Sequence, residues 1–166
     1  MLDVEAYVRE VGGRIVSAVH DPRWDFRFRI VDQPEPNAFS IPGGGVCVSR
    51  GLLALVNRED ELAGVLAHEI AHVTRRHSAR EQRKSIIPGL LTVPGHIVGG
   101  VVNQDLGALI NAPLDTVGGA WLSRYSRSQE IEADRIAMDA AAKAGYDPLA
   151  LGDTSRRLRR RGPDFI

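Results

Sequence analysis

Cysteine is almost absent from this sequence of 166 residues, in which Cys47 is the only one. A single cysteine excludes a disulfide within the chain and a metal cluster built from several thiolates. An excess of either charge is also missing, because 21 lysines and arginines balance 21 aspartates and glutamates. The charge balance therefore gives no indication of a nucleic-acid partner or of an acidic one.

Long apolar runs are missing too. Residues 1–5 hold no basic stretch followed by an apolar one, so we expect no secretory signal in this sequence. The longest weakly polar stretch, residues 86–102, is interrupted by prolines, glycines and His96, which disfavours a membrane-spanning helix. We therefore expect a soluble protein or one that associates peripherally with a membrane.

The residues that are present fit one globular domain. Hydrophobic residues make up 43% and charged residues 25% of the chain, which is usual for a folded soluble protein. A chain of this length can bury a core without covalent or metal staples. We expect a single domain over residues 1–166, in which residues 150–166 form a basic tail that is either flexible or helical.

The first predicted helix covers residues 4–19, where valine and isoleucine recur at helical spacing, and ends near Asp21. Gly12 and Gly13 lie inside this helix. Each weakens it by about 1 kcal/mol relative to alanine. Tertiary packing must therefore hold the helix in place.

Three short strands are predicted next. Phe26, Phe28 and Ile30 alternate with the residues between them, which is the period of a strand with one buried face. Residues 38–41 and 46–48 lie on either side of a Pro-Gly-Gly-Gly segment, which predicts a hairpin. A short helix over residues 52–56 should follow.

Two longer helices carry the polar residues of interest. The first begins near residue 59, with Asn57 as its candidate N-cap. The second begins at Ser126 or Ser128 and stops at Gly145. On the first of these helices an apolar stripe predicts the buried face, formed by Leu62, Leu66, Ile70 and Val73.

A metal-binding pattern lies on that helix. His68 and His72 are four residues apart, so both imidazoles lie on one face, away from the apolar stripe, and can bind one cation. Glu69 can reach a water molecule on that cation, which is peptidase chemistry, although the pattern also occurs by chance on polar helices. His77 falls on the continuation of the apolar stripe, and we interpret it as structural or surface rather than as a third ligand.

A catalytic zinc site needs a third protein ligand, and Glu130 is the best candidate. Glu130 and Asp134 share one helix face with three small residues, which allow two helices to approach closely, and Glu132 lies on the far side. Asp134 would orient a ligand imidazole. The alternative is that all three acids form a charged surface, but uncompensated carboxylates on an alanine face would be costly to bury. The small residues are Ala133, Ala137 and Ala141.

Four segments together make a more specific motif than the histidine pair alone: His68 to His72, Glu130 to Asp134, Asn37 to Phe39 and Pro42 to Gly44. In these segments the sequence resembles the gluzincin peptidases of the HtpX and type-I CAAX prenyl protease family, and most closely the BepA-like soluble bacterial branch. The resemblance extends over residues 4–150 by the order of the elements.

The resemblance implies an α+β fold: a mainly helical, zincin-like metallopeptidase domain with a small antiparallel or mixed sheet beside the active-site helix. It implies one Zn²⁺ per chain, bound by His68, His72 and Glu130. It implies Glu69 as the general base and Asp134 as the residue that orients His68. The expected reaction is metal-dependent hydrolysis of internal bonds in peptides or unfolded proteins, in the quality control of misfolded or envelope proteins.

The resemblance also implies a periplasmic or membrane-associated location; otherwise we expect a cytoplasmic one. Many family members carry a signal peptide, transmembrane helices or a C-terminal repeat domain, and none of these is visible in this sequence. An extended substrate would add a strand beside Asn37, Ala38 and Phe39. The alternative is that Asn37 caps a turn and Phe39 fills the core.

Several roles stay open at this point. Residues 84–120 should hold one or two irregular helices, and residues 86–100 form either a flap with His96 as an inhibitory fourth ligand or a packed connection. Arg75 is either solvated or contacts a substrate carboxylate. The candidates for stabilising the oxyanion are Tyr125, Arg127, Arg135 and His96.

Two rival functions remain. A noncatalytic, metal-stabilised interaction domain would need four protein ligands and would have no use for Glu69. Nucleic-acid binding would use the arginines near the C-terminus, which more often form a solvated helix face. Those arginines are Arg156, Arg157, Arg159, Arg160 and Arg161.

Overall fold

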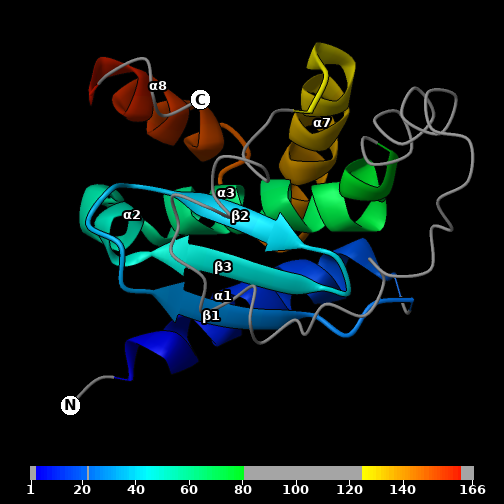
Figure 1. The fold of residues 1–166 in the computed structure, drawn as a ribbon, viewed down its shortest axis with the longest axis horizontal. Coiled ribbons are helices and arrows are strands. Elements are labelled where there is room, and N and C mark those ends of the chain that lie inside the picture. The colour runs from blue at the N-terminus through cyan, green and yellow to red at the C-terminus, as the bar shows by residue number, and fades with distance from the viewer. Residues whose placement is uncertain (1–2, 22, 81–124, 162–166) are drawn as a thin grey trace, which may run out of the picture.

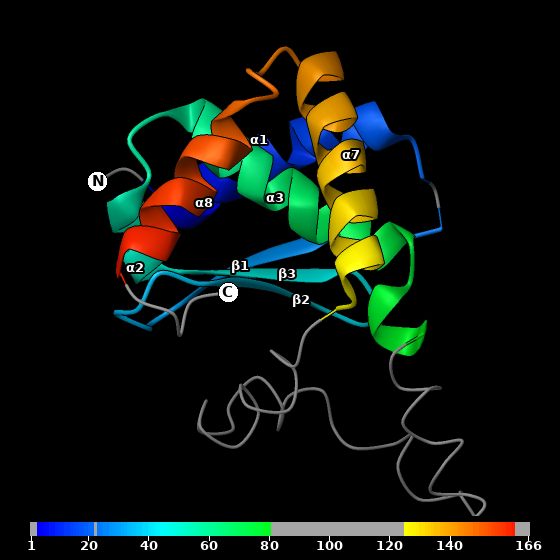
Figure 2. The same cartoon turned by 90° about the horizontal axis from the view of Figure 1, so that it is seen from above.

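The computed structural model describes residues 3–21, 23–80 and 125–161, with side chains in the last helix as far as Arg157. A three-stranded sheet carries helices α1, α3, α7 and α8 on one of its faces (Figures 1 and 2). The α+β fold with a small mixed sheet is confirmed. The elements are α1 (Val4–Val19), β1 (Arg27–Val31), β2 (Ala38–Ile41), β3 (Gly45–Ser49), α2 (Arg50–Leu55), α3 (Glu59–Thr74), α7 (Arg127–Lys143) and α8 (Ala150–Arg161).

The sheet has the strand order β1-β3-β2. Strands β2 and β3 form the predicted hairpin and pair antiparallel, with Ala38 opposite Val48. Strand β1 pairs parallel to β3, with Arg27 opposite Gly45. Helix α1 packs against β1, and α3 packs against β2, so the edge strand β2 lies beside the helix that carries the histidine pair.

The core lies between the sheet and its helices. Helix α3 is buried on nearly all sides, because α1, α7, α8 and the sheet all pack against it. The predicted apolar stripe of α3 is buried as expected. The fully buried members of the core include Val8, Val11 and Ile15 of α1, Val46 and Val48 of β3, and Leu62, Leu66 and Ile70 of α3.

Gly12 explains why α1 tolerates a weak helix former. A Cβ atom at Gly12 would lie 2.4 Å from the ring of Phe28 in β1, which is far inside van der Waals contact. Helix α1 therefore packs against the strand through a position where only hydrogen fits. At Gly13 a Cβ atom would meet nothing within 4 Å.

The N-terminus of α3 differs from the prediction. Its N-cap is Arg58, which makes no side-chain capping bond, so the assignment of Asn57 as N-cap is wrong. The backbone N–H of Asn57 instead donates to Oε2 of Glu61 at 2.8 Å. The Glu61 side chain, in the first helical turn, thus accepts a hydrogen bond from the backbone that precedes the helix. The side chain of Asn57 is not needed for capping.

Helix α7 agrees closely with the sequence. Ser126 is the N-cap and forms a capping box with Gln129, and Gly145 follows the helix with a φ of 86°. A left-handed glycine at this position is a common helix stop. Among the described residues no helix combines the length and the apolar character needed to cross a membrane.

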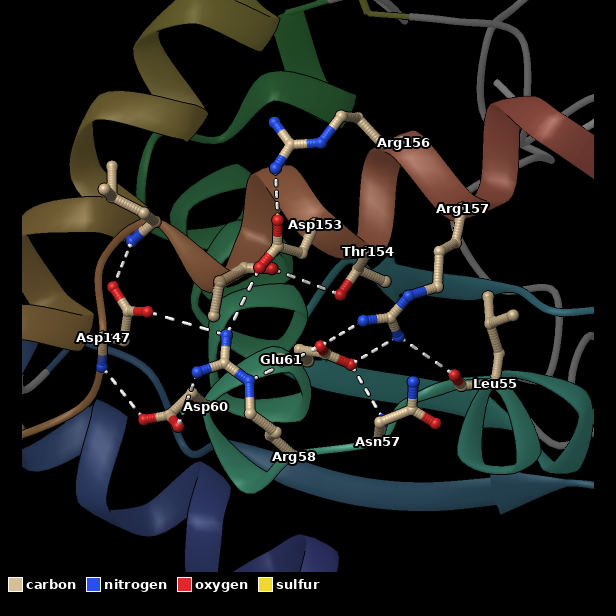
Figure 3. Close-up of polar contacts among 12 residues, drawn as sticks. Leu55, Asn57, Arg58, Asp60, Glu61, Asp147, Asp153, Thr154, Arg156 and Arg157 are labelled. Atoms are coloured by element: carbon tan, nitrogen blue, oxygen red, sulfur yellow. Dashed lines mark hydrogen bonds and ion pairs between the residues drawn. The ribbon is translucent and has the colours of Figure 1, made fainter.

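A buried ion pair ties α8 to the start of α3 (Figure 3). The guanidinium of Arg157 donates to both oxygens of Glu61, at 2.5 and 2.8 Å, and the Glu61 side chain is only 1% exposed. These bonds, and after them the N–H of Asn57, outweigh burial and lower the pKa of Glu61 from 4.5 to about 2. The expectation of a solvated face is therefore wrong for Arg157, because its partner lies in the core.

The two glycines of α1 give a matched test of helix packing. We expect Gly13→Ala to raise the free energy of unfolding by about 0.5–1 kcal/mol, because alanine favours the helix and the site is open. Gly12→Ala should be less stable than Gly13→Ala by about 1–3 kcal/mol, because the ring of Phe28 must move within a packed core. Urea denaturation of both variants measures this difference. Equal stability would show that the close contact does not constrain the helix.

From the Glu61–Arg157 ion pair we predict how the free energy of unfolding depends on pH in the acid range. Because the pKa of Glu61 is depressed in the folded protein, the pair stabilises it above the ordinary pKa of 4.5, and this contribution is lost as the pH falls toward 2. Arg157→Met should cost on the order of 3 kcal/mol at pH 7 by leaving a buried carboxylate unpaired. This difference from wild type should shrink on acidification.

The exposed neighbour Arg156, which pairs with Asp153 (Figure 3), supplies the control. Arg156→Met should change the free energy of unfolding by less than about 1 kcal/mol at every pH, because solvent screens an exposed pair. Denaturation in a constant excess of chelator keeps the metal content equal across the series. A loss for Arg157→Met that is independent of pH would contradict the assigned role of the Glu61 carboxylate.

Candidate metal centre

The site lies where α7 crosses the C-terminal half of α3 (Figures 1 and 2). Ala133, Ala137 and Ala141 of α7 are at most 1% exposed, and these small side chains let the two helices approach closely. His68 and His72 project from α3 toward α7, and Glu130 projects back from the first turn of α7. The sequence thus places a short carboxylate opposite two imidazoles.

The three side chains converge on one point. The Nε2 atoms of His68 and His72 lie 2.9 Å apart, and the Glu130 oxygens lie 3.4 Å from Nε2 of His68 and 3.6 Å from Nε2 of His72. One candidate ligand atom from each residue lies within 4.8 Å of the others. Tetrahedral zinc holds its ligand atoms about 3.3 Å apart. Two imidazoles and one carboxylate at this spacing therefore fit a zinc ion with a fourth position left open.

The electrostatics of the site also suit a cation. Burial lowers the pKa of His68, but Asp134 and Glu130, with the charge of Glu69, outweigh it and raise the pKa to about 10. Burial and the neighbouring charges of His68 and His77 lower the pKa of His72 to about 2. The carboxylates around His68 thus favour a positive charge at this point of the site. The same carboxylates would stabilise a bound metal ion.

Asp134 lies beside His68, as the resemblance implies. Its Oδ1 is 2.9 Å from Nδ1 of His68, off the direction of an ideal hydrogen bond. The argument that Glu130 and Asp134 would be buried on the alanine face is wrong, since their side chains are 44% and 56% exposed. Both carboxylates project past the buried alanines to the rim of the site, where water reaches them.

Glu69 lies half-buried between α3 and the edge strand β2. Burial raises the pKa of Glu69, while the charge of His68 and the hydroxyl and N–H of Ser40 act in the opposite direction. Ser40 is itself buried in β2. The candidate base therefore touches the strand that forms the edge of the sheet.

The environment of His72 was not foreseen. Nδ1 of His77 lies 2.9 Å from Nδ1 of His72, and Nε2 of His77 lies 3.2 Å from Glu132. His77 is fully buried, so of the two interpretations the structural one is right and the surface one is wrong. The assignment of Glu132 to a far side is also wrong, because Glu132 faces the turn that follows α3.

A backbone feature explains both errors. Helix α3 ends at Thr74, and Arg76 has a φ of 54°. The backbone therefore leaves the helical path before His77, and a projection that continues the helix puts His77 in the wrong place. Nothing in the sequence signals this turn, since arginine rarely adopts a left-handed conformation.

Of the candidates for oxyanion stabilisation, Tyr125 lies at the site. Its ring stacks on His72 with centroids 3.8 Å apart, and its hydroxyl hydrogen-bonds the Ser78 hydroxyl at 2.8 Å. Arg127 and Arg135 are exposed on α7. His96, the flap over residues 86–100 and the helices expected in residues 84–120 lie outside the described residues.

Arg75 is exposed, and its guanidinium makes an ion pair. Its Nε lies 3.0 Å from Glu132, so the guanidinium belongs to the group around His77. Arg75 is thus exposed to solvent, as one of the two expectations has it, and it also pairs with Glu132.

Comparisons with known proteins agree with this geometry. The family model described as Peptidase family M48 matches residues 3–165. The "Putative beta-barrel assembly-enhancing protease" of Vibrio cholerae is 37% identical over 158 residues, which are 92% of this chain and 32% of that protein. The "Beta-barrel assembly-enhancing protease" of Yersinia pestis is 33% identical over 157 residues, which are 92% of this chain and 32% of that protein.

A mitochondrial relative belongs to the same group. The "Mitochondrial metalloendopeptidase OMA1" of Schizosaccharomyces pombe is 37% identical over 146 residues, covering 87% of this chain and 41% of that protein. The chain thus spans about a third of the length of the bacterial relatives. The metalloendopeptidase names imply a metal cofactor for the family. The match along nearly the whole chain confirms the resemblance seen in the motifs, and the chain belongs to Peptidase family M48.

Proposed function

We propose that this chain is the catalytic domain of a zinc-dependent metalloendopeptidase. The observation that carries the proposal is the convergence of His68, His72 and Glu130, whose candidate ligand atoms lie within 4.8 Å of one another, next to the carboxylate of Glu69. When bound, zinc supplies an activated water, with a pKa of about 7, and polarises the scissile carbonyl.

Glu69 is the proposed general base. Its carboxylate takes a proton from the attacking water and passes it to the leaving amine. Burial raises the pKa of Glu69, which brings its proton affinity closer to that of the groups between which it moves the proton. The contact with Ser40 holds the carboxylate on the side of the site that faces β2.

Tyr125 is the proposed partner of the oxyanion among the described residues. Its ring is fixed on the imidazole of His72, and its hydroxyl is held by Ser78. A hydroxyl held in place can donate to a developing negative charge without reorganising. Arg127 and Arg135 have no comparable contact with the histidine pair.

The substrate is proposed to bind as an added strand along β2. In the described sheet β2 pairs only with β3 and keeps one free edge. Asn37 is held next to β2 by its N–H, which donates to Ser49 Oγ at 2.8 Å, and Phe39 pairs with Cys47. Main-chain pairing beside Asn37, Ala38 and Phe39 would accept many sequences, as unfolded proteins require.

The proposed biological role is quality control of envelope proteins. The bacterial relatives are named for enhancing β-barrel assembly, which is consistent with a periplasmic or membrane-associated location. A noncatalytic metal domain is disfavoured, since an open coordination position with Glu69 beside it serves no structural purpose. Nucleic-acid binding through α8 is disfavoured because Arg156 and Arg157 already pair with Asp153 and Glu61.

Glu69→Gln tests the base. We expect the variant to lose about 10²–10⁴-fold in cleavage of casein or a quenched peptide, because the amide cannot accept the proton from water. Bound zinc, measured by elemental analysis, should equal that of wild type. Equal cleavage by both proteins would remove Glu69 from this role.

Metal removal tests the cofactor. The purified protein should hold one zinc per chain, lose cleavage on chelation and regain it when zinc returns. His72→Ala should fail to regain cleavage, because the site loses a ligand. Cleavage that persists at full rate in the fully chelated wild type would contradict the proposal.

A further inference from the structure

We propose that His77 and Glu132 are positioning residues for His72: they fix its imidazole orientation and its proton, so that Nε2 is presented to the metal. The inference rests on the proposed metal site. It concerns residues that lie outside the ligand set and the base. Its basis is a continuous chain of contacts from Glu132 through His77 to His72.

The chain of contacts permits only one arrangement of protons. For Nε2 of His72 to bind a metal, its lone pair must be free, so the proton must sit on Nδ1. That N–H then donates to Nδ1 of His77, which lies 2.9 Å away and must accept. His77 therefore carries its own proton on Nε2 and donates it to Glu132, which lies 3.2 Å away. The carboxylate of Glu132, at the end of this series of contacts, sets the tautomer of both imidazole rings.

Because both imidazoles are buried, each of their N–H groups needs an acceptor within the protein. His72 is 1% exposed and His77 is fully buried, so water does not replace either bond. An imidazole N–H without an acceptor at such depth is costly. Tyr125 stacks on the face of His72, while His77 contacts its edge. The ring is thus held in two directions and cannot turn without losing both contacts.

Glu132 is in turn held by arginines from the segment after α3. Arg75 Nε lies 3.0 Å and Arg80 Nη1 lies 3.6 Å from its carboxylate. The left-handed residue Arg76 lies between them, and this turn is what directs His77 toward His72. The turn, His77 and Glu132 therefore form one connection between the end of α3 and the first turns of α7.

His68 and His72 differ in how the carboxylates that orient them make contact. His68 meets the carboxylate of Asp134 directly, at 2.9 Å. His72 lies deeper, and the carboxylate of Glu132 on α7 reaches its Nδ1 through the ring of His77. Helix α7 consequently provides the candidate ligand Glu130 and both carboxylates that orient the histidines.

The test measures zinc affinity, by competition with a chromophoric chelator, in the full chain. We expect His77→Leu to bind zinc about 10- to 100-fold more weakly than wild type, because Nδ1 of His72 loses its acceptor. His77→Asn should recover part of this loss, since its amide oxygen can take the place of Nδ1. Glu132→Leu should also weaken binding, and it is safer for folding because Glu132 is partly exposed.

Two readouts separate positioning from packing. The absorption spectrum of the cobalt-substituted protein should shift in His77→Leu and return toward wild type in His77→Asn, because it reports the geometry around the metal. Asp139→Asn changes an exposed acid of α7 that pairs with Lys143 and should leave affinity and spectrum unchanged. The free energy of unfolding in chelator reports any purely structural effect.

The outcomes distinguish this proposal from the proposed function. Wild-type zinc affinity and spectrum in both His77→Leu and Glu132→Leu would overturn the positioning role and leave the peptidase proposal intact. Weakened binding in these variants, with equal cleavage by wild type and Glu69→Gln, would support positioning and overturn the proposed base. Loss of affinity in His77→Leu with no recovery in His77→Asn would show a packing role and overturn the inference.

Discussion

The close approach of α7 to α3 is the constraint on which the candidate site depends. Glu130 reaches the two imidazoles only because Ala133, Ala137 and Ala141 bring the helix axes together. A larger side chain at any of these positions would separate the two helices and move Glu130 away from the imidazoles, from which its oxygens lie 3.4 and 3.6 Å. The three ligand candidates are thus positioned by packing, and the packing is set by the smallest apolar side chain that a helix offers.

Helix α3 is held at both ends by charged side chains that contact buried partners. At its start the buried Glu61 binds Arg157 of α8 (Figure 3), and after its end the buried His77 binds Glu132 of α7. Burying such groups is costly unless each one is paired. Both pairs join α3 to a helix that follows it by more than fifty residues, so the helix that carries the candidate ligands is fixed by the C-terminal part of the fold.

Local periodicity and capping predicted most of what lies within one element. The apolar stripe of α3, the hairpin, the Ser126 start and the Gly145 stop of α7 all depend on residues a few positions apart. Contacts between distant elements were not predictable in the same way. The sequence around Arg157 predicts a solvated arginine, because it does not reveal that Glu61 lies beside it. The sequence likewise predicts Asn57 as a cap, because it does not reveal that Glu61 accepts a hydrogen bond from the Asn57 backbone. The contact of His77 with His72 was not predicted because the backbone leaves the helical path at Arg76, whose φ of 54° has no sequence signal.

The site is asymmetric, and the asymmetry has a consequence for access. On the His72 side, Tyr125 and His77 seal the imidazole, which is 1% exposed. On the His68 side, Glu130 and Asp134 reach the rim, and Glu69 faces Ser40 of the edge strand. Among the described residues, the site is therefore closed around His72 and His77, while its more exposed groups lie beside His68. In the part of the chain that the structure describes, the site thus has one side sealed by the buried contacts of His72 and another side next to the edge strand β2.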